Sequence, residues 1–206
     1  MNDQLTALER DIGFLKSLAE EGRPATVIGG SILVAAGLTF GIASLAEWAV
    51  WTHRAPNFGP WTSLALWGAS FVIFMVELAV ILRRLAPHKS AGRANRTLSA
   101  AWTGAGYTIF ALIACALIAA WRTGSDAPAM LIPAMILCVY GLCWTVAASA
   151  AGKSWVWAAA VGSYASAALV AVFCAGPAVY LIYALALVAV AILPGLALIR
   201  QSRPAQ

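Results

Sequence analysis

Few side chains in this chain are of a type that does chemistry, and two of those few are carboxylates inside long apolar runs. Glu47 lies between Ala46 and Trp48, and Glu77 lies in the run FMVELAVILRR. An ionisable group within a membrane span is costly and often marks a functional site. Glu47 falls at the end of its run, so we expect it to be interfacial and hydrated. Glu77 lies deeper, where it either accepts a structural hydrogen bond or takes up a proton.

The other reactive residue types are placed in ways that exclude most kinds of catalytic or metal site. The motifs HExxH and GxSxG and the Walker loop are absent from the sequence, which argues against an intramembrane protease or an ATP-driven pump. His53 and His88 fall in connections at opposite faces, so they form no haem or metal pair. The four cysteines lie in apolar runs without CxxC spacing, where we expect buried small hydrophobes. The sequence therefore predicts no metal and no cofactor.

Mid-span polar and small residues supply the remaining candidates. Hydroxyls at mid-depth can line a small cavity, although they are more often packing contacts. The candidate cavity-lining residues are Tyr107, Tyr140 and Tyr164. Small residues spaced four apart allow helices to cross closely. The candidate packing residues are Gly37, Gly41, Ala158, Gly162 and Ser166.

The composition indicates which elements must position these groups. Hydrophobic residues make up 62% of the 206 residues and charged residues only 10%, against about 45–50% and about 25% in soluble domains. So few charges cannot cover a soluble surface, whereas a bilayer accepts apolar side chains. Runs of about 20 apolar residues suffice to cross it as helices. The predicted spans are about 26–48, 61–82, 98–121, 128–150, 154–174 and 177–199, with bends expected at Pro133 and Pro194.

The basic residues orient this all-α bundle. Eleven of the 13 Lys and Arg residues fall on one side of the predicted spans, and only Arg54 and Arg122 on the other. The positive-inside rule then places both termini in the cytoplasm. The same rule explains the net charge of +5, so we expect no nucleic-acid partner. Tryptophans are expected to form a belt at each interface; the inner belt contains Trp102, Trp155 and Trp157.

Residues 1–25 are predicted to form a cytoplasmic amphipathic helix ahead of the membrane domain at 26–199, and residues 200–206 a cytoplasmic tail. The helix carries an apolar stripe of Leu5, Leu8, Ile12 and Leu15. Its balance of charge is acidic, which disfavours an anionic membrane surface. We therefore expect it to pack on protein: as a cap over its own bundle, as a dimer seam, or as a partner-binding helix.

The beginning of the chain also resembles a group of proteins. The run LERDIGFLKSLAEEG precedes the glycine-rich run GGSILVAAGLTFG. In this the first 45 or so residues resemble uncharacterised small multi-pass bacterial inner-membrane proteins. The resemblance implies an inner-membrane location and transfers neither an activity nor functional residues.

Three classes of function remain open. The chain is a non-enzymatic membrane component that acts through protein contacts, a channel or permease for a small neutral or weakly charged solute, or a membrane enzyme acting on lipid or quinone. Ion-coupled transport and acid–base chemistry both require titratable groups within the membrane, and this chain has few. The sequence therefore favours the non-enzymatic component, with the lipid bilayer and a protein partner or a second copy as its contacts.

Overall fold

The computed structural model describes residues 28–52, 60–85 and 93–201, and the regular elements within these ranges are all helices. Six helices there are long and apolar enough to cross a membrane: Ile28–Thr52, Trp61–Leu85, Leu98–Thr123, Ala127–Ala151, Ser154–Val172 and Ala178–Gln201. Their ends differ from the predicted ones by four residues at most. The prediction of an all-helical chain with six helices able to span a membrane is thus confirmed for the described residues. The helix predicted within 1–25 and most of the tail lie outside them.

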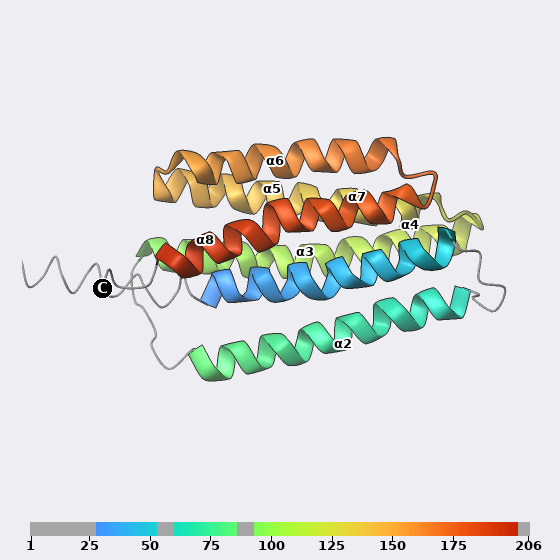
Figure 1. The fold of residues 1–206 in the computed structure, drawn as a ribbon, viewed down its shortest axis with the longest axis horizontal. Coiled ribbons are helices and arrows are strands. Elements are labelled where there is room, and N and C mark those ends of the chain that lie inside the picture. Colours follow the sequence, from blue (N-terminus) through green and yellow to red (C-terminus); the bar gives the residue numbers. More distant parts are fainter. Residues whose placement is uncertain (1–27, 53–59, 86–92, 202–206) are drawn as a thin grey trace, which may run out of the picture.

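The six spans run side by side along the long axis of the molecule (Figure 1). The first helix, drawn in blue, is followed by α2 (Pro60–Leu85) and α3 (Arg93–Thr123). The fourth span comprises α4 (Ala127–Met130) and α5 (Ile132–Ala151), and the fifth is α6 (Ser154–Val172). The sixth comprises α7 (Ala178–Leu187), the π-helical turn η1 (Val188–Ile192) and α8 (Leu193–Gln201).

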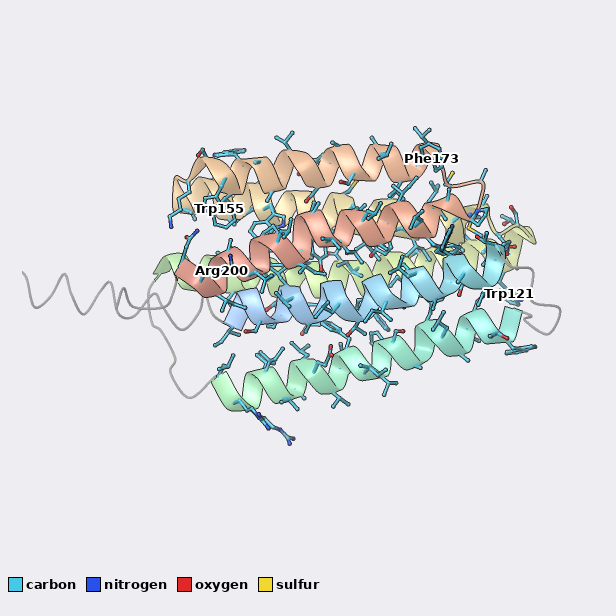
Figure 2. The ribbon with its side chains drawn as sticks, in the orientation of Figure 1. Trp121, Trp155, Phe173 and Arg200 are labelled. Carbon is cyan, nitrogen blue, oxygen red and sulfur yellow. The ribbon has the colours of Figure 1, made fainter. Side chains whose placement is uncertain are left out.

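The two ends of the bundle are named here after residues labelled in Figure 2. Trp155 and Arg200 lie at one end, called the Arg200 end, and Trp121 and Phe173 lie at the other, called the Trp121 end. The charge pattern predicts that the Arg200 end is cytoplasmic.

The packed core is centred on the hairpin of α5 and α6 and on the sixth span. Gly152 ends α5 with φ 63°, a left-handed conformation that glycine adopts without a Cβ clash, and its N–H closes the last turn on the Ala148 carbonyl at 3.0 Å. The chain can therefore turn back within two residues. The largest fully buried side chains of these elements are Trp144, Leu137, Leu187, Val170, Val179 and Val190.

Aromatic rings join α3, α5 and α6. The ring of the buried Trp144 meets the ring of Trp102 edge-on, with centroids 5.5 Å apart, and that of Trp155 at 6.4 Å. Trp102 and Trp155, which are predicted for the inner belt, are half-buried because their rings pack against this core residue. Trp157 is 46% exposed. The belt itself stays a prediction.

The sixth span is interrupted where its sequence contains Pro194. Proline lacks the N–H that would bond to the carbonyl four residues earlier, here that of Val190, and its ring crowds that carbonyl. The helix adopts a π turn in which the Leu193 N–H bonds to the Val188 carbonyl. The indole N–H of Trp144 donates to the Val190 carbonyl at 2.9 Å. A side chain from α5 thus replaces the donor that proline lacks. The predicted bend at Pro133 corresponds to the break between α4 and α5 at Leu131.

We predict that Trp144→Phe destabilises the protein by about 1–3 kcal/mol, because the Val190 carbonyl would lose the indole donor that takes the place of the missing proline N–H. The measurement is the free energy of unfolding in mixed micelles. Trp157→Phe is the control, since Trp157 is exposed and makes no described hydrogen bond. In a Pro194→Ala background the backbone at this position would regain its N–H, so Trp144→Phe should cost less there. An equal cost in both backgrounds would contradict this role of Trp144.

Glycines bring the first helix against the sixth span. A Cβ on Gly30 would lie 2.7 Å from the Gly195 carbonyl oxygen, and a Cβ on Gly195 would lie 2.8 Å from that of Gly30. Gly37 makes the next contact, since its Cβ would lie 2.6 Å from Cγ1 of Ile192. Gly41, predicted to act with Gly37, has no heavy atom within 4 Å of its Cβ position. The close crossing therefore depends on Gly30, Gly37 and Gly195.

Gly30→Ala is expected to destabilise the bundle by about 1–3 kcal/mol, because its methyl group would meet backbone that cannot move aside. Gly41→Ala is the matched control: it adds the same atom in the same helix, in open space, and gains helix propensity. Thermal unfolding in detergent compares the two variants. If Gly41→Ala were the more damaging of the pair, the crossing would not be where we place it.

Helix α2 lies at the edge of the bundle (Figure 1). Only 6% of the most apolar stretch of Trp61–Leu85 is buried, against 44% in the fourth and sixth spans. Its packing on the first helix includes the rings of Phe74 and Phe40, with centroids 5.4 Å apart. This pair of helices holds both intramembrane carboxylates.

Candidate functional site

Both intramembrane carboxylates lie between the first helix and α2, and each is hydrogen-bonded across that boundary. Ser63 of α2 donates its hydroxyl proton to Oε1 of Glu47. In the opposite sense, Thr39 of the first helix donates to Oε2 of Glu77 at 2.8 Å. We call these four residues the carboxylate seam. Because lipid offers no hydrogen-bond partner, such contacts stabilise one particular register of the two helices.

Glu47 is buried, with only 1% of its surface exposed. Oε1 also accepts a bond from the indole N–H of Trp51, one turn further on, at 2.9 Å. Oε2 is buried and has no hydrogen-bond partner among the described residues. The hydroxyl of Tyr180 on α7 lies within electrostatic range of the carboxylate. Glu47 therefore has both bonds on one oxygen and none on the other.

The prediction that Glu47 is hydrated is wrong, because its side chain is buried; its place at the interface stays a prediction. The first helix continues to Thr52, so Glu47 lies more than a turn inside it. Trp67 of α2 and Tyr180 of α7 pack against each other nearby, with ring centroids 6.4 Å apart. Hydropathy along one helix could not reveal that two other helices close over its end.

Glu77 lies in a different setting. It is half-buried, and its described hydrogen bond comes from Thr39, which lies near the middle of the first helix. Fourteen residues separate Glu77 from Ser63, or about 21 Å along α2. The two carboxylates are therefore too far apart to act as an acid–base pair. Arg83 and Arg84 are exposed at the end of α2, and within the described residues neither forms an ion pair with Glu77.

The structure does not bring the three tyrosines together. Tyr107 is 75% exposed on the surface of α3, whereas Tyr140 is 8% exposed and its ring meets that of Trp102 edge-on at 5.8 Å. The Tyr164 ring covers Gly141, where an added Cβ would lie 2.7 Å from Cε1 of the tyrosine. The residues that do surround the carboxylates, Thr39, Trp51 and Ser63, are of types too common in membrane helices to be singled out from the sequence.

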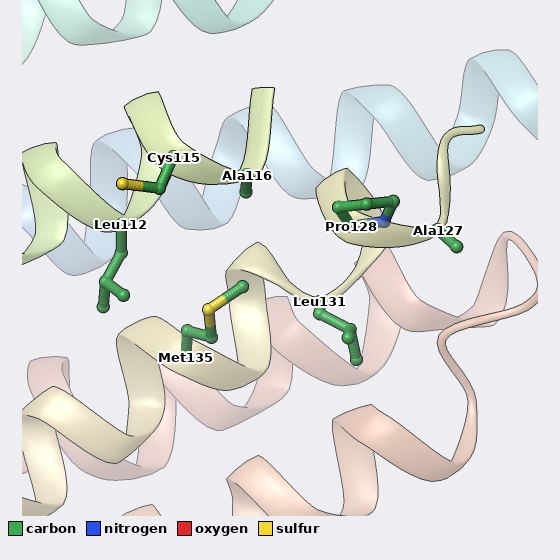
Figure 3. A pocket seen from close by; sticks show the side chains of 7 residues that line it. All are labelled: Leu112, Cys115, Ala116, Ala127, Pro128, Leu131 and Met135. Carbon is green, nitrogen blue, oxygen red and sulfur yellow. The ribbon is translucent and has the colours of Figure 1, made fainter. Parts of the chain in front are cut away.

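A first cavity, of about 450 Å³, lies between α3 and the fourth span near the Trp121 end (Figure 3). Its lining is Leu112, Cys115 and Ala116 from α3 with Ala127, Pro128, Leu131 and Met135 opposite. This lining offers no acid, base or charged group. A second cavity, a groove of about 350 Å³, lies between α6 and the sixth span and includes the predicted small residues Ala158, Gly162 and Ser166.

The expectation that the cysteines are buried holds only for Cys143, which donates to the Ala101 carbonyl at 3.7 Å. Cys115 and Cys138 are exposed on the bundle, where lipid takes the place of a protein core, and Cys174 is half-buried. Among the described residues no three His, Cys, Asp or Glu side chains come together as a metal site.

Comparison with protein-family models, with curated proteins and with solved structures finds no match to this chain. The function must therefore be argued from the geometry alone.

We predict that Ser63→Ala destabilises the helix pair by about 0.6 kcal/mol, the average for a hydrogen bond between membrane helices, and by about 1.7 kcal/mol at most. The loss arises because Oε1 of Glu47 keeps only the Trp51 donor. Ser70→Ala is the control on the same helix, since the Ser70 hydroxyl bonds to the Leu66 carbonyl of α2 itself. The free energy of unfolding in mixed micelles is measured for both. Equal effects would show that Ser63 contributes nothing across the seam.

Proposed function

We propose that the protein is a non-enzymatic component of the bacterial inner membrane that acts through contacts with a partner protein inside the bilayer, made by the exposed face of α2. The observation that carries the proposal is the half-exposed carboxylate of Glu77 near the middle of an otherwise apolar span.

A carboxylate in this position needs more partners than the described residues supply. An acidic side chain at the centre of a span costs about 3 kcal/mol on insertion scales. Thr39 donates to Oε2 only, and Oε1 of Glu77 has no described partner. A hydrogen-bond donor on a neighbouring transmembrane helix would lower this cost.

The surroundings of Glu77 suit a helix as the partner. Three apolar residues of α2 flank Glu77: Val76 precedes it, and Ile73 and Val80 lie about one helical turn away on either side. Ile73 is 52% exposed, Val76 58% and Val80 42%. They form an apolar surface around one polar group, the pattern by which a polar residue fixes register between membrane helices.

The location and orientation rest on the sequence. The excess of Lys and Arg on one side of the spans supports cytoplasmic termini, and the resemblance of the first 45 or so residues supports a bacterial inner membrane. A contact made by the N-terminal helix, or by a second copy through it, stays a prediction outside the described residues.

The other two classes of function lack a supporting observation. A permease would be favoured by a polar pathway through Glu77 and the tyrosines, but Tyr107 lies on the surface and Tyr140 in the apolar core. A lipid or quinone enzyme would be favoured by a cleft ending at Glu77, which lines neither of the two cavities described above.

The test is photo-crosslinking in native membranes with a photoreactive amino acid in place of Val76. We expect a discrete protein adduct, because Val76 adjoins Glu77 on the proposed contact face. Glu77→Leu should weaken the adduct several-fold by removing the polar contact, and Glu77→Gln, which keeps hydrogen-bonding capacity, should weaken it less.

Val161 of α6 provides the matched control position. It is a valine at 64% exposure, against 58% for Val76, and lies a similar number of residues from the Arg200 end. Adducts with lipid alone at both positions, or protein adducts unaffected by Glu77→Leu, would contradict the proposal. An adduct with a second copy of the chain would show that the partner is another copy of this protein and not a different protein.

A further inference from the structure

The groove between α6 and the sixth span has the length of one leaflet. It extends along α6 from Trp155 to Ser166, eleven residues or about 16 Å. This is about half the thickness of the hydrocarbon core.

Small side chains create this space. Ala158, Gly162 and Ser166 follow one another at intervals of four on α6 and leave room that longer side chains would fill. On the other wall, Pro194 and the π turn before it interrupt the regular ridges of the sixth span. A Cβ on Gly162 would lie 3.9 Å from Cγ1 of Val190, in ordinary van der Waals contact, so the absence of a side chain at Gly162 is what leaves space at this point.

Two cationic side chains, those of Lys153 and Arg200, lie at the Arg200 end of the groove. Leu193 and Ala197 line the groove, and Arg200 is the next residue on the same stripe of α8. Lys153 precedes α6 and donates to Oε1 of Gln201 at 2.7 Å, which joins the ends of the two helices. Both cationic side chains are exposed.

The described residues place no acidic side chain at this end. Among the described residues the acidic side chains are Glu47 and Asp126, which lie toward the Trp121 end, and Glu77 on α2. Figure 2 shows Arg200 and Trp155 at the same end of the bundle. The positive potential at the mouth of the groove is therefore uncompensated within the described chain.

One residue of the groove carries a buried hydrogen-bond donor that has no acceptor among the described residues. The indole N–H of Trp155, a residue that lines the groove, is buried and has no partner among the described residues. A buried donor without an acceptor costs about 1–3 kcal/mol. Ester and phosphate oxygens are acceptors that a bound lipid would bring to this residue.

We propose that this groove binds one anionic phospholipid from the leaflet at the Arg200 end. One acyl chain lies along the small residues of α6, and the phosphate lies between Lys153 and Arg200. The occupant is a lipid because the groove is as long as one leaflet and has two exposed cationic side chains at its Arg200 end. It is an anionic lipid because basic pockets between membrane helices attract such headgroups.

The experiment is native mass spectrometry of the full-length protein, delipidated in mild detergent and titrated with phosphatidylglycerol or phosphatidylcholine. The wild type should bind one phosphatidylglycerol in preference to phosphatidylcholine. The double variant Lys153→Gln, Arg200→Gln should lose about tenfold or more in affinity for phosphatidylglycerol, since each cation contributes separately. Its affinity for phosphatidylcholine should not change.

Arg83→Gln with Arg84→Gln is the matched charge control, because it removes two cations at the same end of the bundle but on α2. Gly162→Leu should abolish binding of both lipids by filling the groove, and Gly104→Leu, where nothing lies within 4 Å of the added Cβ, should not. The charge variants leave the core untouched, so they decide the matter even if Gly162→Leu fails to fold.

Equal binding of the two lipids, equal losses in the two charge pairs, or full competition by inorganic phosphate would each overturn the proposal. A dimer that Gly162→Leu abolishes while lipid binding persists would assign the groove to a second copy, and would likewise overturn it.

Discussion

A bilayer interior contains no water to satisfy a backbone carbonyl, and the sixth span contains a proline that removes the usual donor. The indole N–H of Trp144 supplies a donor to the Val190 carbonyl in place of the missing one. To donate there, Trp144 must be fully buried between α5 and the sixth span, and Trp102 and Trp155 pack on its ring. One missing N–H thus accounts for the π turn and for the place of the central aromatic cluster. The first helix crosses the same region, with Gly37 against Ile192 and Gly30 against Gly195.

The two carboxylates of the bundle also need hydrogen-bond donors that lipid does not supply, but they find them in a different kind of place. Trp144 makes its bond inside a packed core, whereas Glu47 and Glu77 make theirs at the boundary between the first helix and a peripheral helix. Each carboxylate has one oxygen bonded across the seam and one without a described partner. For Glu47 that second oxygen is buried, whereas Glu77 is only half-buried as a residue. The two residues are chemically alike, so the difference between their surroundings decides their roles.

Much of the fold could be predicted from the sequence because hydropathy depends on residues that are neighbours along the chain. The six spans are therefore found to within a few residues, and both prolines mark real interruptions. What could not be predicted depends on which helices are neighbours in space. The burial of Glu47 requires α2 and α7 to close over it. The spacing of Gly37 and Gly41 singles out Gly37, but the residue that it contacts is Ile192 of the sixth span. The role of Gly30 could not be predicted, because it depends on Gly195 lying opposite. The donor for the Val190 carbonyl lies 46 residues away in the chain.

Helix α2 combines little packing against the bundle with a carboxylate that has a described bond on one oxygen only. Apolar surface gains nothing by leaving lipid for another apolar surface, so membrane helices associate through close packing and hydrogen bonds. The α5–α6 hairpin and the sixth span have both, whereas little of α2 is buried and its described bonds to the first helix are those of the carboxylate seam. A helix held by so few contacts gains most from a further neighbour, because that neighbour would supply the packing that the rest of the chain does not. The oxygen of Glu77 that has no described partner adds a polar contact in the same place. The least buried of the described spans thus also carries a mid-span carboxylate with a described bond on one oxygen only. This is the arrangement expected of a surface completed by another protein.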